Sequence, residues 1–134
     1  MANRIFRISI LGDLEFAFYF VATCIGSAGL MMKNPGTGEI TSWSDEGEQI
    51  VTTYEELLVK IKSGNMTNVQ FWSSPDEDMF VSWSRGDCQS TFSLYLDGVD
   101  VIYSVAVASK LIEGLLAQDM RDKFVGDVFA LNIE

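Results

Sequence analysis

Residues 69–96 read VQFWSSPDEDMFVSWSRGDCQSTFSLYL, and this stretch decides the fold class. Apolar and polar residues alternate within it over 69–73, 79–84 and 91–96. A period of two is typical of strands that bury one face. Short segments that contain Pro or Gly next to acidic residues separate the three runs and indicate turns. The stretch therefore predicts a meander of antiparallel strands.

The segment that follows the meander is predicted to add one more strand and a helix. Asp97-Gly98 lies between two apolar runs, which is a strong signal for a hairpin turn. We therefore expect 99–107 to be the returning strand. Ser109 is a suitable N-cap for a helix that reaches about residue 124. Residues 127–133 are predicted to form a final edge strand.

The segment before the meander contains the clearest helix, over 54–63. Thr53 and Glu56 have the spacing of a capping box, in which each residue satisfies a backbone N–H of the other. Leu57 and Ile61 are one turn apart and define an apolar face. Gly64 is a natural C-cap. Because every local signal agrees, these residues predict a helix by themselves.

The first third of the chain is less decided. Residues 4–11 alternate loosely and predict a strand. Residues 14–25 are apolar on both faces, which favours a central strand; a helix capped by Asp13 and ended by Gly26 is the alternative. Residues 30–33 and 39–43 flank the sequence NPGTG and predict a hairpin, and an acidic, solvated stretch follows over 44–49.

These elements predict an α+β fold, with a mainly antiparallel sheet of about five to seven strands packed against two helices at about 54–63 and 109–124. The 134 residues fit a single domain over 1–134, since most domains have between 50 and 200 residues. The apolar share of 48% is enough for a core without disulfides or metals.

Charge and composition exclude several classes of function. Nine Lys and Arg face nineteen Asp and Glu, so the net charge is −10, and histidine is absent. A nucleic-acid binder usually has a basic face, and a membrane-surface protein a basic amphipathic segment. Without histidine the commonest general base and the commonest neutral metal ligand are missing. We therefore expect a protein that is not an enzyme, with no cofactor, no metal, no nucleic acid and no membrane as partner.

Two further features bear on the compartment. The uncharged segment 16–32 is interrupted by Gly26 and Gly29 and preceded by acids, so neither a membrane span nor a signal peptide is expected. Cys24 and Cys88 form no metal-binding motif and are expected to be two buried thiols in a reducing compartment, with a disulfide as the alternative. A cytoplasmic location follows from both expectations.

The acidic residues are concentrated in the middle of the chain. Residues 34–59 hold six acids and no Lys or Arg, and 63–109 hold six acids against Arg85 alone. All three tryptophans lie in the same part of the sequence, and Trp is a favoured interface anchor. A face of this kind attracts a cationic partner and speeds its association. The predicted partner-binding residues are Trp43, Asp45, Glu46, Glu48, Trp72, Asp76, Glu77, Asp78, Trp83, Asp87, Asp97 and Asp100.

A small, acidic, histidine-free α+β chain with no catalytic motif resembles the immunity proteins of bacterial polymorphic toxin and contact-dependent growth inhibition systems. The resemblance covers the whole chain in size, charge and composition. It implies a cytoplasmic antitoxin that binds a cognate toxin domain, often a cationic nuclease, and covers its active or substrate-binding surface.

Two alternatives from other classes remain open. The first is a small-molecule-binding or carboxylate-based enzymatic domain that uses a buried acid such as Glu15 or Asp13. The second is a structural subunit that forms a homodimer through an exposed strand edge. Whether the chain is a monomer or a homodimer does not follow from its sequence.

Overall fold

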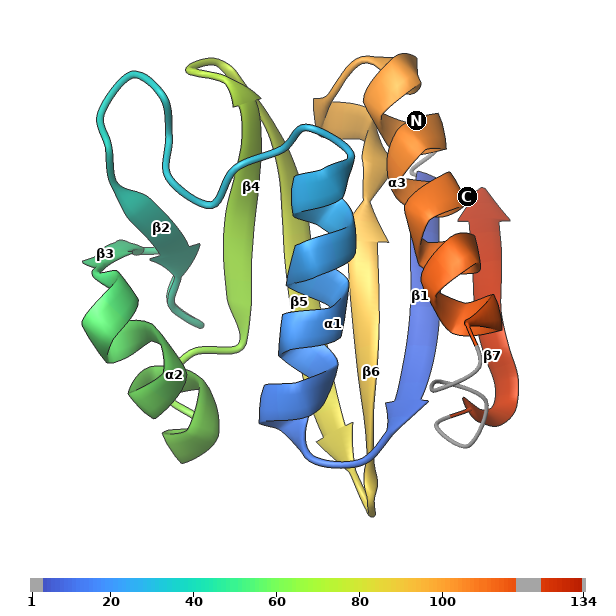
Figure 1. Ribbon diagram of the computed structural model, residues 1–134. Helices are drawn as coiled ribbons and strands as arrows, with labels where there is room; N and C mark the ends of the chain where they lie inside the picture. Colours follow the sequence, from blue (N-terminus) through green and yellow to red (C-terminus); the bar gives the residue numbers. More distant parts are fainter. Residues whose placement is uncertain (1–3, 118–123, 134) are drawn as a thin grey trace.

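The computed structural model describes residues 4–117 and 124–133 and contains a five-stranded antiparallel sheet (Figure 1). The predicted α+β class is therefore confirmed. The sheet order is β4-β5-β6-β1-β7, so the first and the last strand of the chain are neighbours in the sheet. The strands are β1 (Arg4–Leu11), β4 (Asn68–Ser74), β5 (Glu77–Gly86), β6 (Gln89–Tyr95) and β7 (Phe124–Ile133). The meander predicted over 69–96 and the edge strand predicted near 127–133 are both present.

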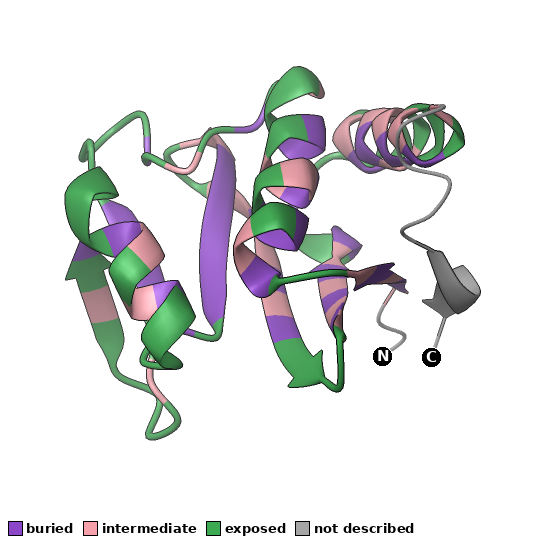
Figure 2. Cartoon of the chain, turned by 60° about the horizontal axis from the view of Figure 1, so that its bottom comes forward, coloured by how far each residue is buried: buried purple, intermediate pink, exposed green. Residues whose placement is uncertain are grey.

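Helices cover one face of this sheet, and a small hairpin stands beside it (Figures 1 and 2). Helices α1 (Leu14–Ser27) and α3 (Val101–Leu116) pack against each other and against the sheet. Helix α2 (Tyr54–Ser63) lies next to α1. On its other side is a hairpin formed by β2 (Ile40–Trp43) and β3 (Gln49–Thr52) (Figure 1). Strand β2 of the hairpin pairs with β3 and also contacts β4 of the large sheet.

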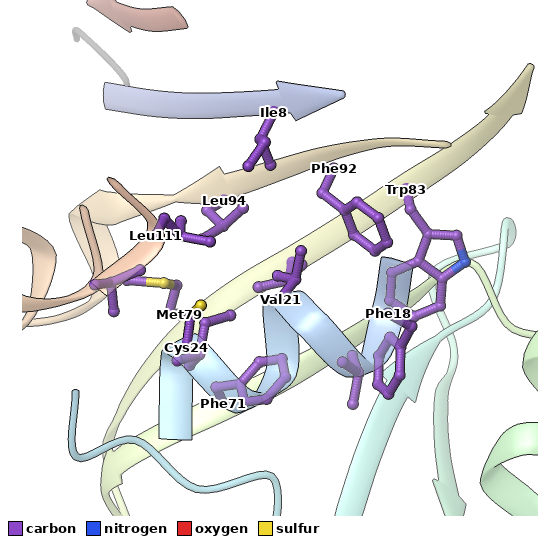
Figure 3. Packing of buried hydrophobic residues seen from close by; sticks show 14 of the residues in the cluster. Ile8, Phe18, Val21, Cys24, Phe71, Met79, Trp83, Phe92, Leu94 and Leu111 are labelled. Carbon is purple, nitrogen blue, oxygen red and sulfur yellow. The ribbon is translucent and has the colours of Figure 1, made fainter. Parts of the chain in front are cut away.

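The hydrophobic core lies between the sheet and the helices (Figure 3). Alternate residues of the strands point into it, as the period of two requires, and Phe71, Phe92 and Ile8 are among its fully buried side chains. Trp83 packs edge-on against Phe18 of α1, with ring centroids 5.4 Å apart, and also contacts Phe92. These contacts fix α1 against the middle of the sheet.

Helix α2 has the predicted bounds of 54–63, with the predicted Gly64 C-cap and the Thr53 half of the predicted capping box, while the Glu56 side chain pairs with Lys60 instead. The Thr53 hydroxyl accepts a hydrogen bond from the Glu56 backbone N–H. Gly64 ends the helix in the left-handed conformation, with φ of 83°, which a residue with a Cβ rarely adopts. Leu57 and Ile61 are buried. The helix is thus specified by local signals that the tertiary structure leaves unchanged.

The strand predicted over 14–25 is wrong, because these residues form α1. Asp13 caps the helix by accepting a hydrogen bond from the Phe16 N–H at 2.7 Å. The buried residues follow helical spacing, but the outward face carries Phe16 and Tyr19 as well. Because both faces of this segment are apolar, its helical period is weak in the sequence. The sequence pattern therefore favoured a doubly covered strand over the alternative helix, which is the one that forms.

The strand predicted over 99–107 is also wrong, and so is the hairpin turn at Asp97-Gly98. A short 3₁₀ turn, η1 (Leu96–Gly98), leads from β6 into α3, which Asp100 caps through the Ile102 N–H. The helix predicted to begin at Ser109 is therefore α3, and it begins at Val101. Its predicted last part, 118–123, lies outside the described residues.

The hairpin predicted from 30–33 and 39–43 is replaced by a different pairing. Residues 40–43 pair with 49–52 across the acidic stretch that was expected to be only solvated. Met31 and Lys33 form single bridges, to Trp72 and Ile40. The expected pair of buried cysteines is half right: both are free thiols, Cys24 is buried and Cys88 is exposed in a turn. Within the described residues, no helix is long and apolar enough to span a membrane.

Candidate protein-binding surface

The predicted acidic residues fall into two groups at opposite ends of β4. Trp43 contacts Asn68 at the beginning of β4, so the β2–β3 turn with Asp45, Glu46 and Glu48 lies at that end. The turn that carries Asp76, Glu77 and Asp78 follows Ser74 at the other end. Seven extended residues separate the two turns by roughly 20 Å. The structure therefore does not bring the acids together on one continuous face.

The remaining predicted acids divide between the same two ends. Asp87 lies in the β5–β6 turn, at the β2–β3 end of the sheet. Asp97 lies within η1 and Asp100 follows it, next to the β4–β5 turn, where Gly98 packs directly on the backbone carbonyl of Asp78.

Three acids at the β4–β5 end already have partners within the chain. Asp97 accepts hydrogen bonds from the Arg4 backbone N–H at 2.9 Å and from its Nε at 2.7 Å. These hydrogen bonds hold the pKa of the Asp97 carboxyl below its ordinary value. Asp100 caps α3, and Asp78 accepts a hydrogen bond from the Gln70 amide at 3.0 Å. Their charges therefore contribute to the fold before any partner arrives.

The three tryptophans have different environments. Trp83 is 7% exposed and belongs to the core, and Trp72 is 9% exposed. Trp43 is 38% exposed, and its indole nitrogen donates a hydrogen bond to Gln70 of β4. Of the three tryptophans, Trp43 is thus the one available as an anchor for another protein, and it lies beside the first acidic group.

The acids of the β2–β3 turn are not neutralised by nearby cations. Asp45, Glu46 and Glu48 are exposed, and none forms a salt bridge with residues 4–117. The basic residues that lie nearest in sequence are engaged elsewhere. Lys60 pairs with Glu56, Lys62 pairs with Glu15, and Lys33 lies 4.8 Å from the centre of the Tyr54 ring. The turn therefore keeps its full negative charge.

A hollow of about 270 Å³ lies next to Trp43. Asp45 and Glu46 line it together with Ile50 from β3 and Asn65 from the α2–β4 connection. Val51, diagonal to Trp43 on the outer face of the hairpin, is 49% exposed. An apolar centre with a charged rim is the usual anatomy of a protein interface. The hairpin surface is defined here as Trp43, Asp45, Glu46, Glu48 and Val51.

The helical layer has exposed apolar side chains that the sequence did not reveal. A hollow of about 440 Å³ lies between α1 and the end of α3, and Phe16, Tyr19 and Phe20 line it beside the buried Cys24. Burial raises the pKa of the Cys24 thiol to about 11, so this group stays protonated near neutral pH. These residues were missed because α1 was predicted to be a strand. The helical spacing of Leu14, Phe18, Val21 and Ile25 was the signal available.

The carboxylates considered for catalysis have structural roles. Glu15 forms an ion pair with Lys62 at 2.8 Å, which joins α1 to α2 and raises the pKa of the lysine. Asp13 is the N-cap of α1. Among residues 4–117 and 124–133, no cluster of three or more His, Cys, Asp or Glu side chains is arranged to hold a metal ion.

Comparison of the chain with protein families, curated proteins and solved structures gives no match.

Proposed function

We propose that this chain is an acidic inhibitor that binds a basic protein domain through the hairpin surface, as an immunity protein binds its toxin. The domain it neutralises would be a cationic toxin such as a nuclease, in the cytoplasm of the producing cell. The chain would act by covering the active or substrate-binding surface of that domain.

One observation carries the proposal: the exposed tryptophan and the unpaired acids occupy the same small element. Trp43 is the one Trp that is accessible, and Asp45, Glu46 and Glu48 surround it without a cation among residues 34–59. Buried aromatic anchors supply most of the free energy at interfaces, while charges at the rim mainly set the rate of association and the choice of partner. Both requirements are met within about ten residues.

The hollow beside Trp43 supports a basic side chain as the contacting group. A guanidinium or ammonium group placed there would meet the carboxylates of Asp45 and Glu46 and the edge or face of an indole ring. Arg is attracted to both kinds of group, by charge-assisted hydrogen bonds and by the cation–π interaction. A nuclease surface, which binds phosphates through Arg and Lys, offers such side chains.

The experiment first sequences the preceding gene, where the proposal expects a secreted protein with a basic C-terminal domain, and then co-expresses that domain with this chain. We expect the two proteins to co-purify and the domain to lose its activity in the complex. Replacing Trp43 by Ala should weaken binding by roughly 30-fold, because a central aromatic anchor contributes about 2 kcal/mol or more. Affinity and rates would be measured by surface plasmon resonance at two salt concentrations.

A matched pair of charge reversals locates the contact. Asp45→Lys with Glu46→Lys and Asp76→Lys with Glu77→Lys change the net charge equally at the two ends of β4. We expect the first pair to slow association at low salt by about tenfold or more, and the second pair to have a smaller effect. Equal effects of both pairs, or none, would show that the hairpin surface is not the contact.

A further inference from the structure

Gln70 of β4 has an amide group that is bound on both sides by other side chains. It is 8% exposed. Its Oε1 accepts hydrogen bonds from Thr41 Oγ1 at 2.6 Å and from Trp43 Nε1 at 3.1 Å. Its Nε2 donates to Asp78 Oδ2 at 3.0 Å. A single buried amide therefore bridges the Trp43 indole and the Asp78 carboxylate.

The direction of this amide follows from the chemistry of its partners. An indole N–H only donates, and an ionised carboxylate only accepts. The amide oxygen must therefore face Trp43, and the nitrogen must face Asp78. The indole N–H fixes the oxygen end of the amide, and Asp78 fixes the nitrogen end by accepting from it.

The backbone of Trp43 is held by a second side chain of β4. Asn68 Oδ1 accepts from the Trp43 backbone N–H at 2.7 Å, and Asn68 Nδ2 donates to the Trp43 carbonyl oxygen at 2.9 Å. One asparagine thus forms the two hydrogen bonds that a neighbouring strand would form. The backbone and indole polar groups of Trp43 are satisfied by β4, while 38% of the residue stays exposed.

The polar network around Trp43 restricts the conformation of its members more than it stabilises the fold. Buried polar residues on a strand stabilise a protein no better than Val or Ile, but a fully satisfied network enforces one arrangement of its members. An exposed aromatic side chain otherwise loses rotamer freedom when a partner binds it. The network around Trp43 removes that freedom in advance.

We propose that Gln70 is the positioning residue of the hairpin surface: it holds the Trp43 indole in its binding orientation, and Asp78 anchors the nitrogen end of the Gln70 amide. The proposal rests on the proposed function in one respect, since Trp43 must contact the partner. It assigns to Asp78 a role in orientation, because its carboxylate and the Trp43 indole are bonded to the same amide.

The first test uses the free protein and needs no partner. The indole N–H signals of the three tryptophans are recorded by NMR and assigned with Trp→Phe variants. In Gln70→Met, which keeps the length of the side chain but not its hydrogen bonds, the Trp43 signal should move upfield and exchange with water about tenfold faster. Thr41→Val, which removes the other hydrogen bond to the same oxygen, should leave that signal in place. An unchanged Trp43 signal in Gln70→Met would overturn the proposal.

A charge-conserving exchange tests the role of Asp78 and remains informative if Gln70→Met does not fold. Gln70→Glu keeps the acceptor for the indole but places two carboxylates together, so the Trp43 signal should shift. Gln70→Glu combined with Asp78→Asn exchanges the amide and the carboxylate and restores every donor and acceptor. We expect the double variant to recover the wild-type signal, and failure to recover it would refute the assigned direction.

The second test measures affinity for the basic domain used above. Gln70→Met should weaken binding about five- to tenfold without changing the salt dependence of association, because no charge is altered. In a Trp43→Phe background the same substitution should have no further effect, since the N–H through which it acts is absent. If Trp43→Ala weakens binding and Gln70→Met does not, the positioning role is refuted. If neither does, the hairpin surface itself is refuted.

Discussion

Gly98 provides the sharpest test of the structure, because the sequence and the fold give different reasons for a glycine there. A hairpin turn at Asp97-Gly98 would need glycine for a positive φ, and Asn would replace it at little cost. In the structure Gly98 is not among the residues with positive φ. A Cβ at this position would instead overlap the backbone carbonyl oxygen of Asp78.

The loss of stability expected for Gly98→Ala follows from the atom that the added methyl group would contact. A carbonyl oxygen inside the β5 ladder cannot rotate away, so either η1 or β5 must shift. Overpacking of a core typically lowers the free energy of unfolding by 1–3 kcal/mol, and a rigid backbone neighbour places Gly98→Ala near the upper end, at about 3 kcal/mol. For a chain of this size the melting temperature should fall by about 10 °C. Gly98→Asn should be at least as destabilising.

Gly26→Ala is the matched control, because it makes the same chemical change near the end of α1. Nothing lies within 4 Å of a Cβ built on Gly26, and its φ is not positive. Ala should therefore stabilise the protein by about 0.5–1 kcal/mol through its higher helix propensity. The assay is urea unfolding followed by tryptophan fluorescence. If Gly98→Ala and Gly98→Asn both lie within about 0.5 kcal/mol of wild type, the contact between η1 and β5 is wrong.

Two further predictions concern titrating groups. Ellman's reagent at pH 8 should modify Cys88 in the native protein and Cys24 only after unfolding, since Cys24 is buried and its pKa is raised to about 11; Cys88→Ser should abolish the native reaction. Because the folded pKa of Cys24 lies above its ordinary value of 9.0, its contribution to stability is complete below pH 9 and is lost as the pH rises to 11. Asp97 behaves in the opposite sense: its folded pKa lies below 3.8, so the Arg4 pairing stabilises the protein above that pH and is lost on acidification. The stability difference between wild type and Asp97→Asn in urea titrations should therefore be larger at pH 6 than at pH 3, and a difference independent of pH would contradict the pairing.

The part of the fold that could be predicted is the part with local signals. Alternation over 69–96 indicated three strands, and the caps of α2 indicated its two ends. The errors occurred where local signals are ambiguous. Residues 14–25 and 99–107 are mostly apolar, and a mostly apolar run with a weak period fits either a covered strand or a helix in a two-layer fold.

The candidate site was predicted only in part, for a related reason. Trp43 and its three neighbouring acids were expected at the surface, and they are exposed. Trp72 and Trp83 also lie near acids in the sequence, at Asp76, Glu77 and Asp78, but both rings are buried in the structure. Asp78, Asp97 and Asp100 have the same charge as Asp45 but are occupied by hydrogen bonds to Gln70, Arg4 and the start of α3. Such partners lie up to 93 residues away in the chain.

The sequence by itself determined the α+β class, the antiparallel meander, helix α2 and the net charge of −10, because periodicity, capping and composition act over a few residues or need no structure at all. The tertiary structure decided that α1 and the first part of α3 are helices, that the acids separate to the two ends of β4, and that Trp43 is the accessible tryptophan. Those outcomes depend on which surfaces pack together. The hydrogen bonds from Gln70 and Asn68 to Trp43 span more than 20 residues, a distance over which local patterns carry no information.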